Sequence, residues 1–381
     1  MIIENARIVL ADRIADGCVR IKGAKIAEVA AHMDGEDRFD AQGMYLTPGF
    51  IDLHVHGGGG RSVMSGRSED VAAMARAHLA DGTTTILPTT LAAPEDQLNA
   101  AIDAVSEAAR TVPQIAGIHL EGPFLSPAQS GAQAPGAIRL PDVAEAERLL
   151  DRKKGLVKMM GAAPELEGAL AVGDLLAREG VIGSMAHTDA AYDDVRRAAD
   201  HGFSDVTHLF SCTSTIRRVN GYRIPGVVEA ALLMDGLTTQ FIGDLRHLPC
   251  ELIRLILKAK GTKNAYLVTD GLEFSAAKLE EGTRYVQYNG METVYEDEVM
   301  KLPDRQAFAG SVATMRKMVR NLVKTAGISL CDAVTLASAT PARRLGLRAK
   351  GAVAAGSDAD LVLLDADLQT KAVISGGIIV K

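Results

Sequence analysis

Short apolar strands alternate with helical patterns through the middle of the chain, and this alternation limits the fold more than any other feature. A strand such as "TTTILPT" precedes a segment with apolar residues three and four apart, "PEDQLNAAIDAVSEAAR". With "FIDLHVH" as the first strand, we count eight strands, each followed by a helix. This order predicts an α/β fold built as a closed (β/α)8 barrel of the TIM type. An open, doubly wound parallel sheet is the alternative, but no GxGxxG motif follows the first strand.

The two ends of the chain have a different pattern. Residues 1–47 and the end of the chain contain short β-branched or alternating runs, broken by Gly and Asp. We expect both ends, residues 1–47 and 345–381, to form one small β-sandwich domain. The catalytic barrel is then expected over residues 48–344.

Charge and composition exclude several classes of protein. The 381 residues carry a net charge of −7 without a block of Lys or Arg, so we expect no nucleic acid and no anionic membrane as a partner. No long apolar run and no signal-peptide pattern is present, which predicts no membrane span. The four cysteines lack CxxC spacing, as expected of a reduced, cytoplasmic chain.

Polar side chains gather at the ends of the predicted strands. They are His54, His56, His119, Glu121, His187, His208, Asp244 and Asp270. In a barrel, the carboxyl ends of the strands meet at one mouth, where catalytic groups lie. His54 and His56 are two residues apart on one strand, so both side chains point the same way. Imidazole and carboxylate groups that converge there predict a divalent-metal site.

Each of these residues alone is weak evidence. A single HxH pair is more often part of a core or a surface, and Asp270 alone could cap the next helix. The joint pattern, with apolar residues before every polar end, favours the metal site. His119 could face the same mouth or form a hydrogen bond behind a ligand.

Several motifs resemble the amidohydrolase superfamily. They are "PGFIDLHVHG", "HLEGPF", "AHTDA", "THLF", "LVTDG", "FAGS" and "GAVAAGSDADLVLLD". Among them, "HLEGPF" resembles a motif of the N-acetylglucosamine-6-phosphate deacetylases. The resemblance implies the same barrel with a small β-sandwich, and hydrolysis of N-acetylglucosamine 6-phosphate to glucosamine 6-phosphate and acetate. It also implies a homodimer and one or two divalent ions, with zinc, iron, manganese and cobalt as candidates.

The same resemblance assigns roles to residues. Glu121, His187 and His208 would hold the main metal ion, and His54, His56 and Asp270 a second one. Asp270 would also be the general base and acid. The substrate-binding candidates are Gln133, Ser211, Cys212, Arg223, His247 and Ser311.

Some of these positions depart from the family pattern. Ser211 and Cys212 stand where the family has Asn and Ala, and Gln133 stands where it has His. Arg223 would reach the site of a partner subunit, with Arg217 and Arg218 as competing positions. The segment Gly310–Ser311 is expected to start a helix whose N–H groups could bind phosphate.

Three other functions remain open at this point. Because of the departures, a deacetylase for a different N-acyl amino sugar or N-acyl compound is a serious alternative. A cyclic-amide hydrolase is disfavoured because the fourth strand, "LVKMMGAAPE", has Lys158 near its start rather than at its end. A non-catalytic barrel scaffold is disfavoured because none of the expected ligands is missing.

Overall fold

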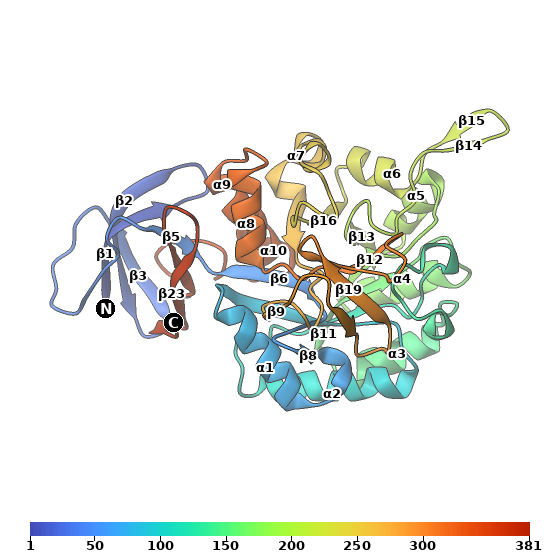
Figure 1. Ribbon diagram of the computed structural model, residues 1–381, viewed down its shortest axis with the longest axis horizontal. Helices are drawn as coiled ribbons and strands as arrows, with labels where there is room; N and C mark the ends of the chain where they lie inside the picture. The colour runs from blue at the N-terminus through green and yellow to red at the C-terminus, as the bar shows by residue number, and fades with distance from the viewer.

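A computed structural model describes residues 1–381 and contains the barrel that the sequence predicts (Figure 1). Its eight strands are β6 (Phe50–Val55), β9 (Thr83–Thr90), β10 (Ile118–Glu121), β11 (Val157–Ala162), β12 (Ile182–Met185), β13 (Phe203–Val206), β16 (Thr238–Ile242) and β17 (Ala265–Val268). Neighbouring strands pair in parallel. Beyond β17, the Asp270 amide donates to the His54 carbonyl over 2.9 Å, which joins the last strand to the first.

Helices follow the strands and cover the outside of the barrel. They are α1 (Ser68–Leu79), α2 (Glu95–Ala109), α3 (Val143–Arg152), α4 (Ala169–Arg178), α5 (Tyr192–Asp200), α6 (Val227–Leu233), α7 (Cys250–Asn264), α8 (Met315–Lys324), α9 (Leu330–Ala337) and α10 (Ala339–Arg344). Helix α8 shows why they pack: Met315, Met318 and Leu322 lie on one face and are buried. None of the helices is both long and apolar enough to cross a membrane.

The expected helix start at Gly310–Ser311 is wrong. Gly310 belongs to strand β21 and has a φ of 117°. The helix starts four residues later, where the Thr314 side chain accepts a hydrogen bond from the amide of Lys317 and so caps α8.

Both ends of the chain meet in a second, smaller sheet. Its strands are β1 (Ile2–Val9), β2 (Ile14–Lys22), β3 (Lys25–Ala30), β4 (Arg38–Asp40), β5 (Tyr45–Pro48), β22 (Leu361–Leu364), β23 (Thr370–Ser375) and β24 (Ile378–Ile379). Strand β5 pairs with β1 on one side and with β22 on the other. The sheet encloses its own core of 14 buried residues and lies beside the barrel (Figure 1).

A single residue, Gly49, separates β5 from β6. A Cβ atom at this position would lie 2.1 Å from the Thr84 hydroxyl oxygen, so only glycine allows the two segments to approach this closely. The Gly49 amide also donates to the Asp360 carbonyl over 2.8 Å. The small sheet therefore holds the base of the strand that carries His54.

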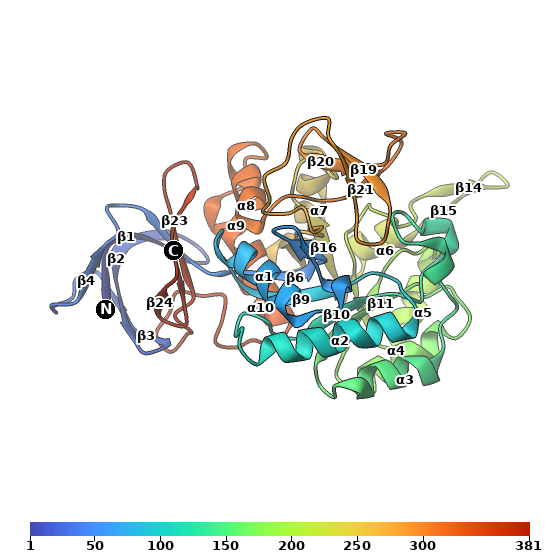
Figure 2. The ribbon, with the colours of Figure 1, turned by 60° about the horizontal axis from the view of Figure 1, so that its bottom comes forward.

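The structure also contains strands that the sequence pattern did not predict. A four-stranded antiparallel sheet between β17 and α8 lies to one side of the barrel strands (Figure 2). A hairpin between β13 and α6 projects from the body of the protein (Figure 1). The additional elements are β18 (Arg284–Val286), β19 (Glu292–Glu296), β20 (Val299–Lys301), β21 (Phe308–Gly310), β14 (Arg217–Val219), β15 (Tyr222–Ile224), β7 (Gly57–Gly58), β8 (Arg61–Ser62) and the short 3-10 helices Val63–Ser65, Pro127–Gln129 and Pro135–Ala137.

Candidate metal centre

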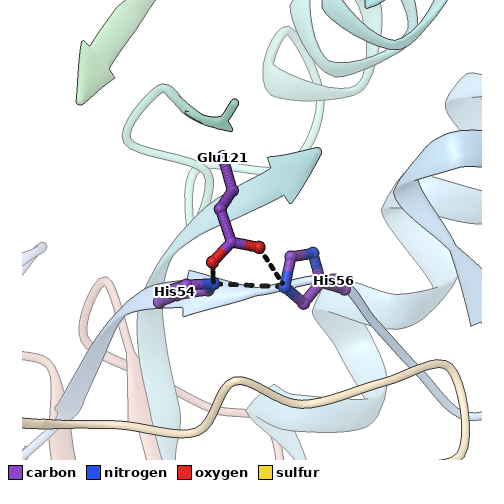
Figure 3. A group of neighbouring side chains, drawn as sticks. All are labelled: His54, His56 and Glu121. Atoms are coloured by element: carbon purple, nitrogen blue, oxygen red, sulfur yellow. Dashed lines mark hydrogen bonds and ion pairs between the residues drawn. The ribbon is translucent and has the colours of Figure 1, made fainter. Parts of the chain in front are cut away.

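Four imidazoles and two carboxylates meet at the carboxyl ends of the barrel strands. They come from His54, His56, Glu121, His187, His208 and Asp270. Figure 3 shows His54 on strand β6 and His56 just beyond its end, with Glu121 pointing toward both rings. The convergence that the sequence predicted from five separate segments is therefore present in the structure.

The backbone turns sharply at three of these residues. His187, His208 and Asp270 each stand two residues beyond the end of a strand. Their φ angles are 44°, 25° and 47°, in a region that residues other than glycine rarely occupy. Strained backbone of this kind concentrates at functional sites. Here it accompanies three of the side chains that meet in the barrel mouth.

Glu121 lies at the centre of the cluster. Its Oε1 atom is 2.9 Å from His208 Nε2, 3.3 Å from His187 Nε2 and 3.4 Å from His54 Nε2. The other oxygen, Oε2, is 3.4 Å from His56 Nε2. Two possible three-ligand groups result, and both contain this carboxylate: His54 and His56 on one side, and His187 and His208 on the other. The arrangement suits either one cation or two cations that share Glu121.

Asp270 completes the group from the last strand. Its Oδ1 atom is 3.0 Å from His56 Nε2 and 3.4 Å from His54 Nε2. The side chain is 16% exposed, whereas Glu121 is 2% exposed. Asp270 is thus the carboxylate of this pair that a bound molecule can reach.

All four imidazoles turn their Nε2 atoms toward this centre because an oxygen atom holds each Nδ1. The Nδ1 partners are Gln240 Oε1 for His54, Thr89 O for His56, Gln129 O for His187 and Ser211 O for His208, at 3.1, 3.1, 2.8 and 3.1 Å. An oxygen acceptor keeps the proton on Nδ1 and leaves a lone pair on Nε2. His54 Nε2 and His56 Nε2 are only 3.1 Å apart, so their lone pairs repel unless a proton or a metal ion binds there.

The electrostatics of the cluster also favour a cation. Burial raises the pKa of Glu121, but the imidazoles of His54, His187 and His208 outweigh burial and hold that pKa well below its usual range. Burial lowers the pKa of His56, but its hydrogen bonds to the carboxylates of Asp270 and Glu121 outweigh burial and raise the pKa to about 10. The carboxylates thus attract positive charge, either protons on the imidazoles or a metal ion. Histidine nitrogen and carboxylate oxygen are ligands for zinc, iron, manganese and cobalt. The residues present fit a divalent metal.

A cavity of about 230 Å³ opens above the cluster. Its lining includes Gln133, Ser211, Cys212 and His247, four of the predicted substrate-binding residues. The unpredicted sheet also contributes, through Gln287 and residues 307–310. No Lys or Arg lines this cavity.

Gln133 is bonded on both sides of its amide. Its Nε2 donates to Glu121 Oε2 over 2.7 Å, and its Oε1 accepts from the Ala92 amide over 2.8 Å. Gln133 therefore holds the central carboxylate in place. His247 donates from Nδ1 to Asp244 Oδ2 over 2.7 Å, which directs its Nε2 away from that carboxylate.

Two predicted substrate-binding residues lie outside the cavity. Ser311 is fully buried, and its hydroxyl accepts a hydrogen bond from the Ala313 amide. Arg223 is exposed on the projecting hairpin, together with Arg217 and Arg218. Neither Ser311 nor Arg223 belongs to the lining of the cavity.

His119 lies behind the cluster. Its ring centre is 4.8 Å from that of His54, and its Nδ1 donates to the Leu53 carbonyl over 3.1 Å. Burial lowers the pKa of His119 well below the usual value, so the ring is neutral. Of the two positions that the sequence left open for His119, the structure places it behind a ligand.

Sequence reasoning missed Gln240, which contacts His54 from inside the barrel, and Asp205, which accepts a hydrogen bond from Gln240. Both lie within strands that read as ordinary apolar runs, "LTTQFIGD" and "FSDVTHLF". The signal that could have identified them is a charged or an amide side chain within an otherwise apolar strand. Both side chains are completely buried in the barrel, where such groups are rarely found without partners.

The family model described as the amidohydrolase family matches residues 45–380. The chain belongs to the amidohydrolase family. This match covers the whole barrel and the C-terminal strands of the small sheet, and it confirms the resemblance noted in the sequence.

Similar proteins within this family are named sugar-phosphate deacetylases. N-acetylglucosamine-6-phosphate deacetylase of Lysinibacillus sphaericus is 30% identical over 99% of this chain and 97% of its own length. N-acetylgalactosamine-6-phosphate deacetylase of Shewanella sp. (strain ANA-3) is 31% identical over 99% and 95%. The crystal structure of N-acetyl-D-glucosamine-6-phosphate deacetylase from Mycobacterium smegmatis superposes with a TM-score of 0.92 and 32% identity over all of both chains. A hydrolase of linear amides is therefore the class of enzyme that these relatives support.

Proposed function

We propose that this amidohydrolase removes the acetyl group from N-acetylglucosamine 6-phosphate and releases glucosamine 6-phosphate and acetate. The observation that carries the proposal is the convergence of four Nε2 atoms on the shared carboxylate of Glu121, beneath a cavity that suits a small molecule. When bound there, a divalent cation supplies acidification of a water molecule and polarisation of an amide carbonyl.

Asp270 is positioned to move the proton. Addition of water to the amide carbon releases one proton, and the Asp270 carboxylate faces the cavity to accept it. The C–N bond then breaks, and the same proton passes from Asp270 to the departing nitrogen. An amine leaves only when protonated, so one group that accepts and returns the proton serves both steps.

The residues around Asp270 hold the candidate metal ligands in place and line the cavity. Gln133 fixes Glu121 from one side, and the backbone carbonyls behind His56, His187 and His208 fix these three rings. His247, oriented by Asp244, offers Nε2 as a hydrogen-bonding group on the cavity wall. We assign His247, Ser211 and Cys212 to substrate contact on this basis.

A sugar phosphate needs a positively charged side chain near its phosphate group, and the cavity of one subunit contains none. The projecting hairpin carries Arg218 directly opposite Arg223, and two like charges in this position repel unless an anion binds between them. Arg217 instead pairs with Asp189 over 2.7 Å. In a homodimer, Arg223 of the partner subunit would supply the phosphate contact, as the resemblance to the family implies.

The relatives favour a second candidate substrate. Proteins named N-acetylgalactosamine-6-phosphate deacetylases match this chain at 30% and 31% identity, and so do proteins named for the glucosamine compound. The two sugars differ only in the orientation of one hydroxyl group, and the same metal centre and the same Asp270 would act on either.

Acetate release from zinc-loaded protein tests the proposal. The substrates are N-acetylglucosamine 6-phosphate, its galactose epimer and unphosphorylated N-acetylglucosamine. We expect the highest kcat/KM for the first and a large loss without the phosphate group. Arg223→Ala should reduce this phosphate preference, whereas Arg217→Ala should not. Absence of acetate release from all three compounds by metal-loaded protein would refute the proposed function.

A further inference from the structure

A buried column of polar side chains runs from the interior of the barrel to His54. It contains Asp205 on β13 and Gln240 on β16, both fully buried. Gln240 Nε2 donates to Asp205 Oδ2 over 2.8 Å, and Gln240 Oε1 lies 3.1 Å from His54 Nδ1. Neither residue lines the cavity, so neither can touch substrate. The column therefore connects a buried charge to a ligand of the candidate metal centre.

Asp205 is surrounded by hydrogen-bond donors. They are Tyr266 Oη at 3.1 Å, Ser184 Oγ at 3.0 Å, Thr238 Oγ1 and Gln240 Nε2 at 2.8 Å, with Arg344 Nε at 3.6 Å as the compensating charge. Because the carboxylate only accepts, the amide of Gln240 must turn its NH2 group toward Asp205. The carbonyl oxygen of Gln240 then faces His54.

This orientation determines the state of the His54 ring. An oxygen beside Nδ1 requires a proton on Nδ1 and leaves the lone pair on Nε2, the atom that faces Glu121. Backbone carbonyls, which can only accept, hold the other three imidazoles. A side-chain amide can turn over and present NH2 instead. Among the four rings, His54 thus depends on a partner that itself needs to be oriented.

We infer that Asp205 is a positioning residue for metal binding, which acts through Gln240 to keep the Nε2 lone pair of His54 directed at the cation. The inference rests on the proposed metal-dependent function and adds two residues that lie outside the metal ligands and the cavity. Groups that orient a metal-binding histidine typically change metal affinity by about 10- to 100-fold when removed.

The test is zinc affinity of the Asp205→Asn variant, measured by competition with a chromophoric chelator. Asparagine can donate to Gln240, so the amide is free to turn its NH2 toward His54. We expect about 10- to 100-fold weaker Zn²⁺ binding and an altered visible absorption spectrum of the Co²⁺-loaded variant. Ser184→Ala is the matched control, since it removes one donor from the same carboxylate and leaves the amide of Gln240 in place. Its zinc affinity should remain within about threefold of wild type.

The outcomes separate this inference from the proposed function. Wild-type protein that binds no Zn²⁺ would refute the metal-dependent function itself. Wild-type affinity and spectrum in Asp205→Asn would overturn the positioning role, and so would an equal loss in Ser184→Ala. If circular dichroism shows that Asp205→Asn does not fold, Gln240→Met decides, because it preserves volume and removes the oxygen beside His54. Unchanged zinc affinity in Gln240→Met would also overturn the inference.

Discussion

Replacement of Gln133 by leucine tests whether this residue holds Glu121 or binds substrate. Both residues are buried, and the distance from Gln133 Nε2 to Glu121 Oε2 is 2.7 Å. A buried hydrogen bond to a charged group contributes about 1.5 to 3 kcal/mol. At about 1.4 kcal/mol for each factor of ten, its loss corresponds to roughly 10- to 150-fold weaker binding of a cation that needs Glu121 in place. The Ala92 amide also loses its acceptor, which lowers the free energy of unfolding by about 1 to 3 kcal/mol.

Zinc competition and steady-state kinetics of Gln133→Leu distinguish the two roles. A residue that positions Glu121 changes the zinc dissociation constant, whereas a residue that only binds substrate changes KM in fully loaded enzyme. Gln287→Leu is the matched control. Gln287 lines the same cavity, but its side chain donates to the Ala309 carbonyl over 3.0 Å and to none of the candidate metal-ligating residues. Wild-type zinc affinity in Gln133→Leu, together with a raised KM, would refute our reasoning and assign Gln133 to the substrate.

Three further predictions follow from the site. Asp270→Asn should reduce acetate release by about 10²- to 10⁴-fold, since the amide cannot accept a proton, while circular dichroism shows an unchanged fold; a smaller loss would exclude Asp270 as the proton acceptor. Removal of metal by a chelator should lower the melting temperature measured by calorimetry, because cation at 100 times its dissociation constant stabilises the folded state by about 2.7 kcal/mol; a melting temperature that ignores the chelator would contradict the metal centre. Burial lowers the pKa of His247, but Asp244 outweighs burial and raises this pKa above the ordinary 6.5. The imidazolium therefore stabilises the folded state fully below about pH 6.5. This stabilisation is lost as the pH rises through the pKa of the folded state. His247→Asn should accordingly lower the free energy of unfolding, measured in urea, by more at about pH 6 than at about pH 9. An equal loss at both pH values would show that His247 beside Asp244 does not titrate this way.

The sequence predicted the barrel and the centre of the site because both depend on local patterns. Most of the strands are short apolar runs that end in a chemically distinctive residue, and parallel strands necessarily bring these ends together. His54 and Asp270 could thus be placed at one mouth without knowledge of any contact. Only the order of strands and the direction of their side chains entered that prediction.

The parts that escaped prediction depend on contacts between distant segments. Strands β18–β21 are only three to five residues long and share no common burial pattern, so this segment resembles a loop in sequence. The partner of Gln133 is Glu121 on a different element, and nothing in "SGAQAP" specifies it. Asp205 was overlooked because one buried charge inside an apolar strand has no periodic signal, although its burial requires partners.

The pairing of β5 with β22 affects how the protein is made. During synthesis, β6 with His54 and His56 leaves the ribosome early, and the strand that completes the sheet at its base, β22, emerges only after the entire barrel. Closure of such a long loop is entropically unfavourable and slow compared with local contacts. The nascent barrel must therefore assemble while the edge of β5 is unpaired. Chaperones should consequently bind, and proteases should cleave, the nascent chain mainly at residues 45–55 until β22 has left the ribosome.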